Sequence, residues 1–498
     1  MATPRRGTVR FRKGARFFEN DLNPSQFSEL AQVLDQGRYD SEVFTTFALK
    51  TLDNLRCTAR AIQTRYPPRF ALRDPTLYTG GAGICIFFYH VWRNLKRISQ
   101  EPSMDESLRQ AMQELAESAL ASAAEYASFS LQGLSQSHQR GTFRWDQVVA
   151  ERGPSVFCGQ AGVYLASVLV ENARANTEAC KAYMEQFIRM GQYAVPDTQH
   201  QAPSCADEVL YGSAGYLLGW LYLQRELGPN AQWLGQDIAE DVVEYLMMRG
   251  SILADNCQPG ANILLYQWHD NMYMGFAHGL MGVTAALLEA CAALPEKARP
   301  TQSDALLKNT LGFIFSHREP DGFYDTRVKL QERSRFQELR STDSKRLVQW
   351  CHGSPGALFL CAATQRRYPH FPNLSEEASL AARVTWQEGL LRKGPGLCHG
   401  IGGNAYALLC CYQIARSSDP NAIEYLQRAL AFADFQVSRS KAVPDAGMAS
   451  AIDRVPWLLY VEGTRIPDNP YSLYEGIAGF GCLLVDLLLP REARMPPC

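Results

Sequence analysis

The sequence has 498 residues, of which 46% are hydrophobic and 20% are charged, a balance typical of globular proteins. A chain of this length exceeds one ordinary compact core, so it predicts either several domains or a repeat architecture in which each unit adds its own core. The net charge of −2 gives no indication of a nucleic-acid partner, and we expect none.

The cysteine content and the apolar runs indicate the compartment. Fourteen cysteines in so long a chain are not the dense disulfide scaffold of a small secreted domain, and the N-terminus lacks the apolar stretch of a secretory signal. We therefore expect a cytoplasmic protein with reduced thiols. No run reaches the roughly 18 apolar residues that span a bilayer; Asp486, for example, interrupts the last long one. We expect no transmembrane segment, while peripheral membrane contact stays open.

The first 16 residues are basic. They contain Arg5, Arg6, Arg10, Arg12, Lys13 and Arg16 and no acidic residue. This composition predicts a disordered N-terminal arm, followed by one folded domain over residues 17–498. An organelle-targeting peptide is the alternative, but the arm has little serine and no clear apolar face.

From about residue 40 the sequence alternates two kinds of helical segment. The first kind is amphipathic: in residues 48–66, 106–127 and 177–195, apolar positions recur every three or four residues. The second kind begins with Gly-x-x-Gly and is apolar on nearly every side, which predicts a helix surrounded by protein. It occurs seven times, with first glycines Gly80, Gly159, Gly212, Gly279, Gly353, Gly400 and Gly476.

This repetition predicts an all-α fold, a seven-bladed α/α toroid (a double-layered α/α barrel) made of seven helical hairpins. Closure of the ring would bury every apolar helix and gather the seven glycine-marked N-termini at one end. Glycine would allow tight turns and close helix approach there. We also expect unpaired N–H groups and helix dipoles at that end, which would attract anions and thiolates.

Two of the glycine pairs follow a Cys-His dipeptide, in WCHGSPG (350–356) and LCHGIGG (397–403). Zinc prefers thiolate and imidazole ligands, and three protein ligands leave a fourth position open for chemistry. We take Cys351, Cys398 and His399 as the ligand set, with His352 in reserve. The alternative is that the cysteines only pack in the core, because their separation of 47 residues matches no short zinc-finger spacing.

Residues 435–468 depart from the repeat. They mix proline, glycine and charge with an isolated WLLYV run, which predicts an inserted loop between the sixth and seventh units.

Several segments together resemble the eukaryotic LanC-like proteins, relatives of bacterial lanthionine cyclases. The resemblance covers nearly the whole chain from about residue 16, and the basic arm and the insertion depart from it. It rests on the seven glycine pairs and on DEVLYGSAGYL, LLYQWHDNMYMGFAHGLMG, RLVQWCHGSPG, LLRKGPGLCHGIGGNAY and IPDNPYSLYEGIAG.

The resemblance implies one zinc ion at Cys351, Cys398 and His399 with an open fourth position. It also implies that glutathione is a co-substrate, whose thiol is added to dehydroalanine or dehydrobutyrine in proteins or peptides to give a thioether. A free thiol is mostly protonated at neutral pH, whereas a zinc-bound thiol is deprotonated, so the implied metal suits the reaction.

The same resemblance assigns roles around the metal. His278 matches the family's acid/base histidine. Apart from the resemblance, Asp207 and Glu208 precede the third glycine pair, so one of them would orient that histidine or exchange a proton with it. Arg346 would stabilise the enolate oxygen. Each has a structural alternative: a histidine bonded to a loop carbonyl, carboxylates that cap a helix, and a solvated arginine.

Glutathione carries two carboxylates, so its binding site needs cations. Lys393, five residues before Cys398, matches a lysine that the family uses near the tripeptide. Arg16 in RFFEN resembles the family's R-x-F-x-N start, which suggests that the arm folds back over the site.

Two other classes of function remain open. A glutathione-binding adaptor in redox or kinase signalling would bind without turnover. A carbohydrate-active α/α-toroid enzyme would need two carboxylates flanking a groove, yet only Asp207, Glu208 and Glu475 lie beside the glycine pairs. The retention of the three ligands with His278 and Arg346 favours the glutathione-adding enzyme.

Overall fold

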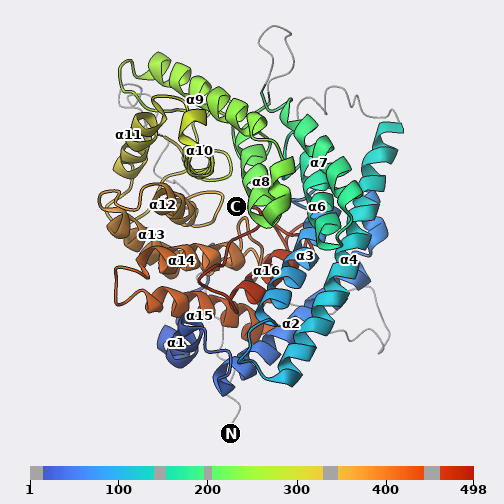
Figure 1. The fold of residues 1–498 in the computed structure, drawn as a ribbon. Helices are drawn as coiled ribbons and strands as arrows, with labels where there is room; N and C mark the ends of the chain where they lie inside the picture. Colours follow the sequence, from blue (N-terminus) through green and yellow to red (C-terminus); the bar gives the residue numbers. More distant parts are fainter. Residues whose placement is uncertain (1–9, 11–14, 140–152, 196–204, 329–345, 442–459) are drawn as a thin grey trace. The chain divides into compact units, whose positions relative to one another are not determined.

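The computed structural model describes residues 10, 15–139, 153–195, 205–328, 346–441 and 460–498. The backbone separates into two compact units, which we describe one at a time (Figure 1). Unit 1 comprises residues 1–136 and 386–496. Unit 2 comprises residues 137–385 and 497–498.

The described part of unit 1 is helical apart from one pair of two-residue strands. In chain order its elements are η1 (Pro24–Phe27), α1 (Ser28–Gln36), α2 (Glu42–Arg65), η2 (Pro68–Leu72), α3 (Gly81–Ile98), most of α4 (Glu106–Gln139), α14 (Ile401–Ala415), α15 (Ile423–Arg439), β1 (Ser440–Lys441), β2 (Tyr460–Val461) and α16 (Ile477–Asp486). Helix α16 contacts α3, α14 and α2, while α15 packs on α14 and α1.

Unit 2 has the same alternation of helices. Its elements are α6 (Gln160–Ala173), α7 (Thr177–Gly191), α8 (Ser213–Glu226), η3 (Gly228–Trp233), α9 (Asp237–Cys257), α10 (Leu280–Ala293), η4 (Glu296–Ala298), α11 (Ser303–Ser316), α12 (Ser354–Arg367) and most of α13 (Leu374–Glu388). Helix α8 lies between α6 and α10, and α10 also contacts α12. Helices α7, α9 and α11 cover α6, α8 and α10 in turn.

The two predicted kinds of helix are confirmed. Helix α10 begins directly after Gly279, the first glycine of the fourth pair, and buries eleven of its 14 residues, on every side. Helix α7 instead buries one face, made of Cys180, Met184, Phe187 and Met190 with Gly191. Apolar helices surrounded by protein are α3, α6, α8, α10, α12, α14 and α16, and each begins directly after the first glycine of a pair.

The glycine pairs close a short loop against the first turn of the helix. At five of the seven, the N–H of the residue after the first glycine donates to the carbonyl seven residues earlier: Gly81 to Asp74, Ser213 to Ala206, Leu280 to Tyr273, Ile401 to Gly394 and Ile477 to Pro470. Our expectation that these N–H groups are unpaired and open to anions is therefore wrong, because the preceding loop satisfies them.

The close approach explains why glycine is required. A Cβ atom on Gly215 would collide with the carbonyl oxygen of Val209, and one on Gly83 with that of Leu77, six residues back in both cases. Gly353 has a second reason, since its φ of +94° lies where residues with side chains are strained.

The polar interruption near the C-terminus also has a structural cause. Asp486 is 2% exposed. Its carboxylate accepts hydrogen bonds from Asn94 (2.8 Å) and Tyr406 (2.7 Å) and lies 2.8 Å from Nε2 of His90. One buried carboxylate therefore connects α3, α14 and α16, and such a group is tolerated only when its oxygens accept hydrogen bonds.

In the described part of the chain, no helix combines the length and the apolar character that crossing a membrane would require.

Two predicted boundaries need correction. Residues 435–439 are not loop: α15 continues to Arg439, because Phe435 and Gln436 are buried on its packed face. Antiparallel β1 and β2 flank residues 442–459, which lie outside the described residues, so the rest of the predicted insertion stays a prediction. At the arm, the carbonyl of Arg10 accepts the N–H of Glu19, so residue 10 contacts the folded part; residues 1–9 and 11–14 are not described.

Two glycine-to-alanine substitutions with opposite expected effects on stability test the contact between the loop and the helix. Gly215→Ala should lower the free energy of unfolding by about 1–3 kcal/mol, because the methyl group displaces the loop at Val209. Gly312→Ala is the control: it lies exposed on α11 with nothing within 4 Å of an added Cβ, and should raise stability by up to about 1 kcal/mol. Urea unfolding measures both. An equal effect at the two sites would contradict the close approach.

Candidate active site

The central contact of unit 2 is between His278 and Glu208. His278 directly precedes Gly279, the N-cap residue of α10, and its Nδ1 lies 2.6 Å from Oε2 of Glu208. Glu208 is 2% exposed and accepts the backbone N–H groups of Leu210 (3.0 Å) and Tyr211. The carboxylate is therefore fixed in place. A carboxylate at this distance accepts the Nδ1 proton, which leaves Nε2 to give or take a proton.

Aromatic rings fix the plane of the histidine. The indole of Trp268 stacks on the His278 imidazole with centroids 4.2 Å apart and planes within 1° of parallel. Tyr211 stacks on Trp268 at 5.8 Å. The sequence analysis missed Trp268. The signal was present, because Trp268 and Tyr273 come just before His278 in one loop, but residue spacing alone cannot predict a stacked pair.

The loop that carries Cys351 packs beside the His278 loop. The carbonyl of Cys351 lies so close to Gly275 that a Cβ there would collide with it, and it accepts the N–H of Ala277 at 3.4 Å. Cys351 is 6% exposed, and the side-chain amide of Gln349 donates to its Sγ at 3.1 Å. The ring of His352 lies 6.1 Å from that of His278. Unit 2 thus brings Cys351, His352, His278 and Glu208 together.

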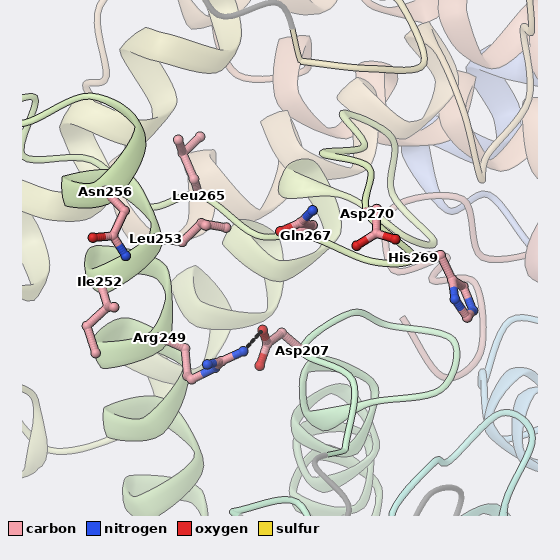
Figure 2. Close-up of a pocket in the computed structure, with 9 residues that line it drawn as sticks. All are labelled: Asp207, Arg249, Ile252, Leu253, Asn256, Leu265, Gln267, His269 and Asp270. Carbon is pink, nitrogen blue, oxygen red and sulfur yellow. Dashed lines mark ion pairs between the residues drawn. The ribbon is translucent and has the colours of Figure 1, made fainter.

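The adjacent carboxylates of Asp207 and Glu208 contact different residues. Glu208 contacts His278, whereas Asp207 turns toward Arg249, with Oδ2 and Nη2 3.6 Å apart (Figure 2). Burial raises the pKa of Asp207, and the Arg249 guanidinium acts in the opposite direction. Of the two candidates, only Glu208 is bonded to the histidine ring.

Arg346 is already paired in unit 2. Its guanidinium lies 2.9 Å from Oδ2 of Asp321 and 4.2 Å from the centroid of the Phe323 ring. Burial raises the pKa of Asp321, but the backbone N–H of Phe323 and the Arg346 cation outweigh it and hold that pKa below its usual value. Arg346 would need to exchange this ion pair to reach an enolate, so its predicted role stays a prediction.

Unit 1 holds the second Cys-His pair. Cys398 and His399 end the loop before α14, with His399 directly before the N-cap residue Gly400. The backbone N–H of Cys398 donates to the carbonyl of Tyr474 at 2.9 Å. Cys398 is 4% exposed and His399 is half-buried. The loop before α16 therefore fixes the second Cys-His pair.

The predicted glutathione-binding residues lie on paired segments of unit 1. The N–H of Arg392 donates to the carbonyl of Arg16 (2.9 Å), and its side chain donates to the carbonyl of Ala15 (3.0 Å). Lys393, the next residue, is half-buried. The end of the basic arm thus lies along the loop that leads to Cys398, and its predicted role at a glutathione site stays a prediction.

Comparison with known proteins decides the family. A family model described as "Lanthionine synthetase C-like protein" matches residues 71–498. The chain belongs to this family.

Two curated relatives span much of this LanC-like chain. It is 27% identical over 462 residues to "Glutathione S-transferase LANCL1" of Danio rerio, covering 93% of each chain. It is 26% identical over 353 residues to "LanC-like protein GCL1" of Arabidopsis thaliana, covering 69% of this chain and 70% of the relative.

A solved structure, nisin cyclase, matches this LanC-like protein with a TM-score of 0.56 and 14% identity, over 86% of this chain and 93% of that one. At this identity the likeness shows the fold alone. This likeness confirms the predicted fold class, which is an all-α protein of the α/α-toroid type.

The stacking of Trp268 on His278 can be tested without assuming an activity. Protons of the imidazole lie over the indole face, so ring current should shift their NMR signals upfield. With histidine labelled at Cε1, Trp268→Ala should move the His278 signal downfield, and Trp268→Phe should move it less; the signal of His269, whose ring lies 4.3 Å from the same indole, should change as well. Trp233→Ala, which removes the indole of η3 that lies under the Lys181 ammonium group, is the control. If the Trp268→Ala and Trp233→Ala spectra agree, the rings do not stack.

Proposed function

We propose that this LanC-like protein is a zinc-dependent enzyme that adds the thiol of glutathione to dehydroalanine or dehydrobutyrine residues of polypeptides, forming a thioether. The observation that carries the proposal is the His278–Glu208 pair beside the buried Cys351 loop. The relative named as a glutathione S-transferase, which aligns over 93% of the chain, supports glutathione as the thiol donor.

Cys351, Cys398 and His399 would hold the zinc ion. Together they offer two sulfur atoms and one imidazole nitrogen, one atom from each residue, which is a donor set that zinc prefers. Neither cysteine is in a disulfide. The amide of Gln349 donates to Sγ of Cys351, a bond that a thiolate accepts more strongly than a thiol. When bound, zinc would lower the pKa of the substrate thiol and so supply the nucleophile.

The addition balances without any further reactant. The sulfur of glutathione bonds to the β-carbon of the dehydroamino acid, and the π electrons move toward the neighbouring carbonyl oxygen. The proton that leaves the thiol is returned to the α-carbon, so no group departs. His278 would carry that proton at Nε2, because Glu208 holds its Nδ1 side.

Cations would assist at two places. Arg346, after exchanging its ion pair with Asp321, would stabilise the negative oxygen of the enolate. Lys393 and Arg16 would bind the carboxylates of glutathione from the two paired segments of unit 1. We also propose a cytoplasmic setting, supported by the fact that none of the 14 cysteines, all of which lie within the described residues, is joined in a disulfide.

Product formation tests this function. Purified protein, glutathione and a peptide with one dehydroalanine should give a product heavier by one glutathione, followed by mass spectrometry. His278→Ala should lower the rate about 10²–10⁴-fold, because the proton carrier is lost. Glu208→Gln should also slow the reaction, since the ring is no longer held.

His370→Ala is the matched control, because that histidine is exposed on the surface of unit 2. Its rate should equal that of the unchanged protein. Glutathione binding without any product, in the unchanged protein, would instead support a non-catalytic adaptor.

A further inference from the structure

Unit 2 contains a pocket that the proposed chemistry does not use. Its volume is about 520 Å³, within the range of small-ligand sites. Helix α9 provides one side through Arg249, Ile252 and Leu253, and the segment that carries Leu265 and Asp270 provides another (Figure 2). Asp207 completes it from the loop before α8. The pocket is therefore lined mainly by polar and charged groups, with a smaller aliphatic part.

The charges in the pocket favour a cation. Asp207 and Arg249 face one another, so their charges largely offset. Asp270 is exposed, and within the described ranges it has no ion-pair partner. Two carboxylates against one guanidinium leave a formal charge of −1. A ligand that brings one positive charge would neutralise the pocket.

The pocket adjoins the His278 site along two separate loops. Asp207 is the neighbour of Glu208, which bonds to His278. His269, which also lines the pocket, is the neighbour of Trp268, which stacks on His278. A polypeptide with its reacting residue at His278 would therefore have flanking residues close to this pocket.

We infer that the pocket binds a basic side chain, lysine or arginine, that flanks the dehydroamino acid in the acceptor polypeptide. The cationic end would be near Asp270 and Asp207, and part of the aliphatic stem would lie against Ile252 and Leu253. Long cationic side chains bury their stems on apolar surface in this way. This inference rests on the proposed function, since it concerns the acceptor of that reaction.

A peptide series tests the inference. The host is a dehydroalanine peptide whose other residues are uncharged. A single lysine is placed in turn at each of the four positions on either side of the dehydroalanine, and each peptide is compared with those that have norleucine or glutamate at the same position. Norleucine keeps the aliphatic stem without the charge. At one or two positions, lysine should raise kcat/KM about three- to tenfold over norleucine, as expected for one partly exposed charge pair, and glutamate should lower it.

Asp270→Asn should remove the advantage of lysine and leave the rate with norleucine unchanged. The substitution suits the backbone, because residue 270 has a φ of +58° and asparagine tolerates that conformation. Asp241→Asn, on the exposed surface of α9 outside the pocket, makes the same charge change and should leave the lysine advantage intact.

Binding of the same peptides with serine in place of dehydroalanine, measured by fluorescence anisotropy, makes the result independent of turnover. Equal affinity for lysine and norleucine peptides at every position overturns the inference, and so does a preference for glutamate, which would make Arg249 the determinant. If no dehydroalanine peptide reacts with the unchanged protein, the proposed function is wrong, while the serine peptides still decide whether the pocket selects a cation.

Discussion

The contact on which the structure depends is the one between a loop carbonyl and the first turn of an apolar helix. A short loop folds back until its carbonyls accept the N–H groups of that turn, and only glycine leaves enough room. The contact recurs at five of the seven apolar helices and in both units, so it fixes the residue just before the N-cap glycine of those helices. His278, His352 and His399 all directly precede an N-cap glycine, namely Gly279, Gly353 and Gly400. The loop bond is present after His278 and His399, whereas His352 precedes Gly353, which has a φ of +94° and a different local conformation.

This geometry also explains how neighbouring residues acquire different roles. Glu208 accepts two backbone N–H groups of its own loop and bonds to His278, whereas Asp207 turns toward α9 and Arg249. Side chains of consecutive residues in a tight loop point in different directions, so one loop serves the histidine and the adjoining pocket. The adjacent residues Trp268 and His269 also have different surroundings, because Trp268 stacks on the His278 imidazole and His269 lines the pocket.

Much of this could be predicted from the sequence, because the relevant signals are local and repeated. The glycine pairs marked the helix starts, apolar periodicity separated helices such as α10 from helices such as α7, and the resemblance to the LanC-like family indicated His278. What could not be predicted depends on long-range geometry. The bonding of first-turn N–H groups to carbonyls seven residues earlier, the stacking of Trp268 and the choice of Glu208 over Asp207 all require knowledge of the folded loops. The boundary at 435 was wrong because composition obscured the buried face that extends α15.

The central claim is that two cysteines and one histidine hold zinc with a position left for an incoming thiol. Zinc-edge X-ray absorption of the purified protein tests it most directly. The account predicts two sulfur ligands at about 2.3 Å and one imidazole nitrogen at about 2.0 Å, with a third sulfur appearing when glutathione is added, and no bound zinc in Cys398→Ala. A protein without zinc, or a zinc spectrum that glutathione leaves unchanged, would contradict it.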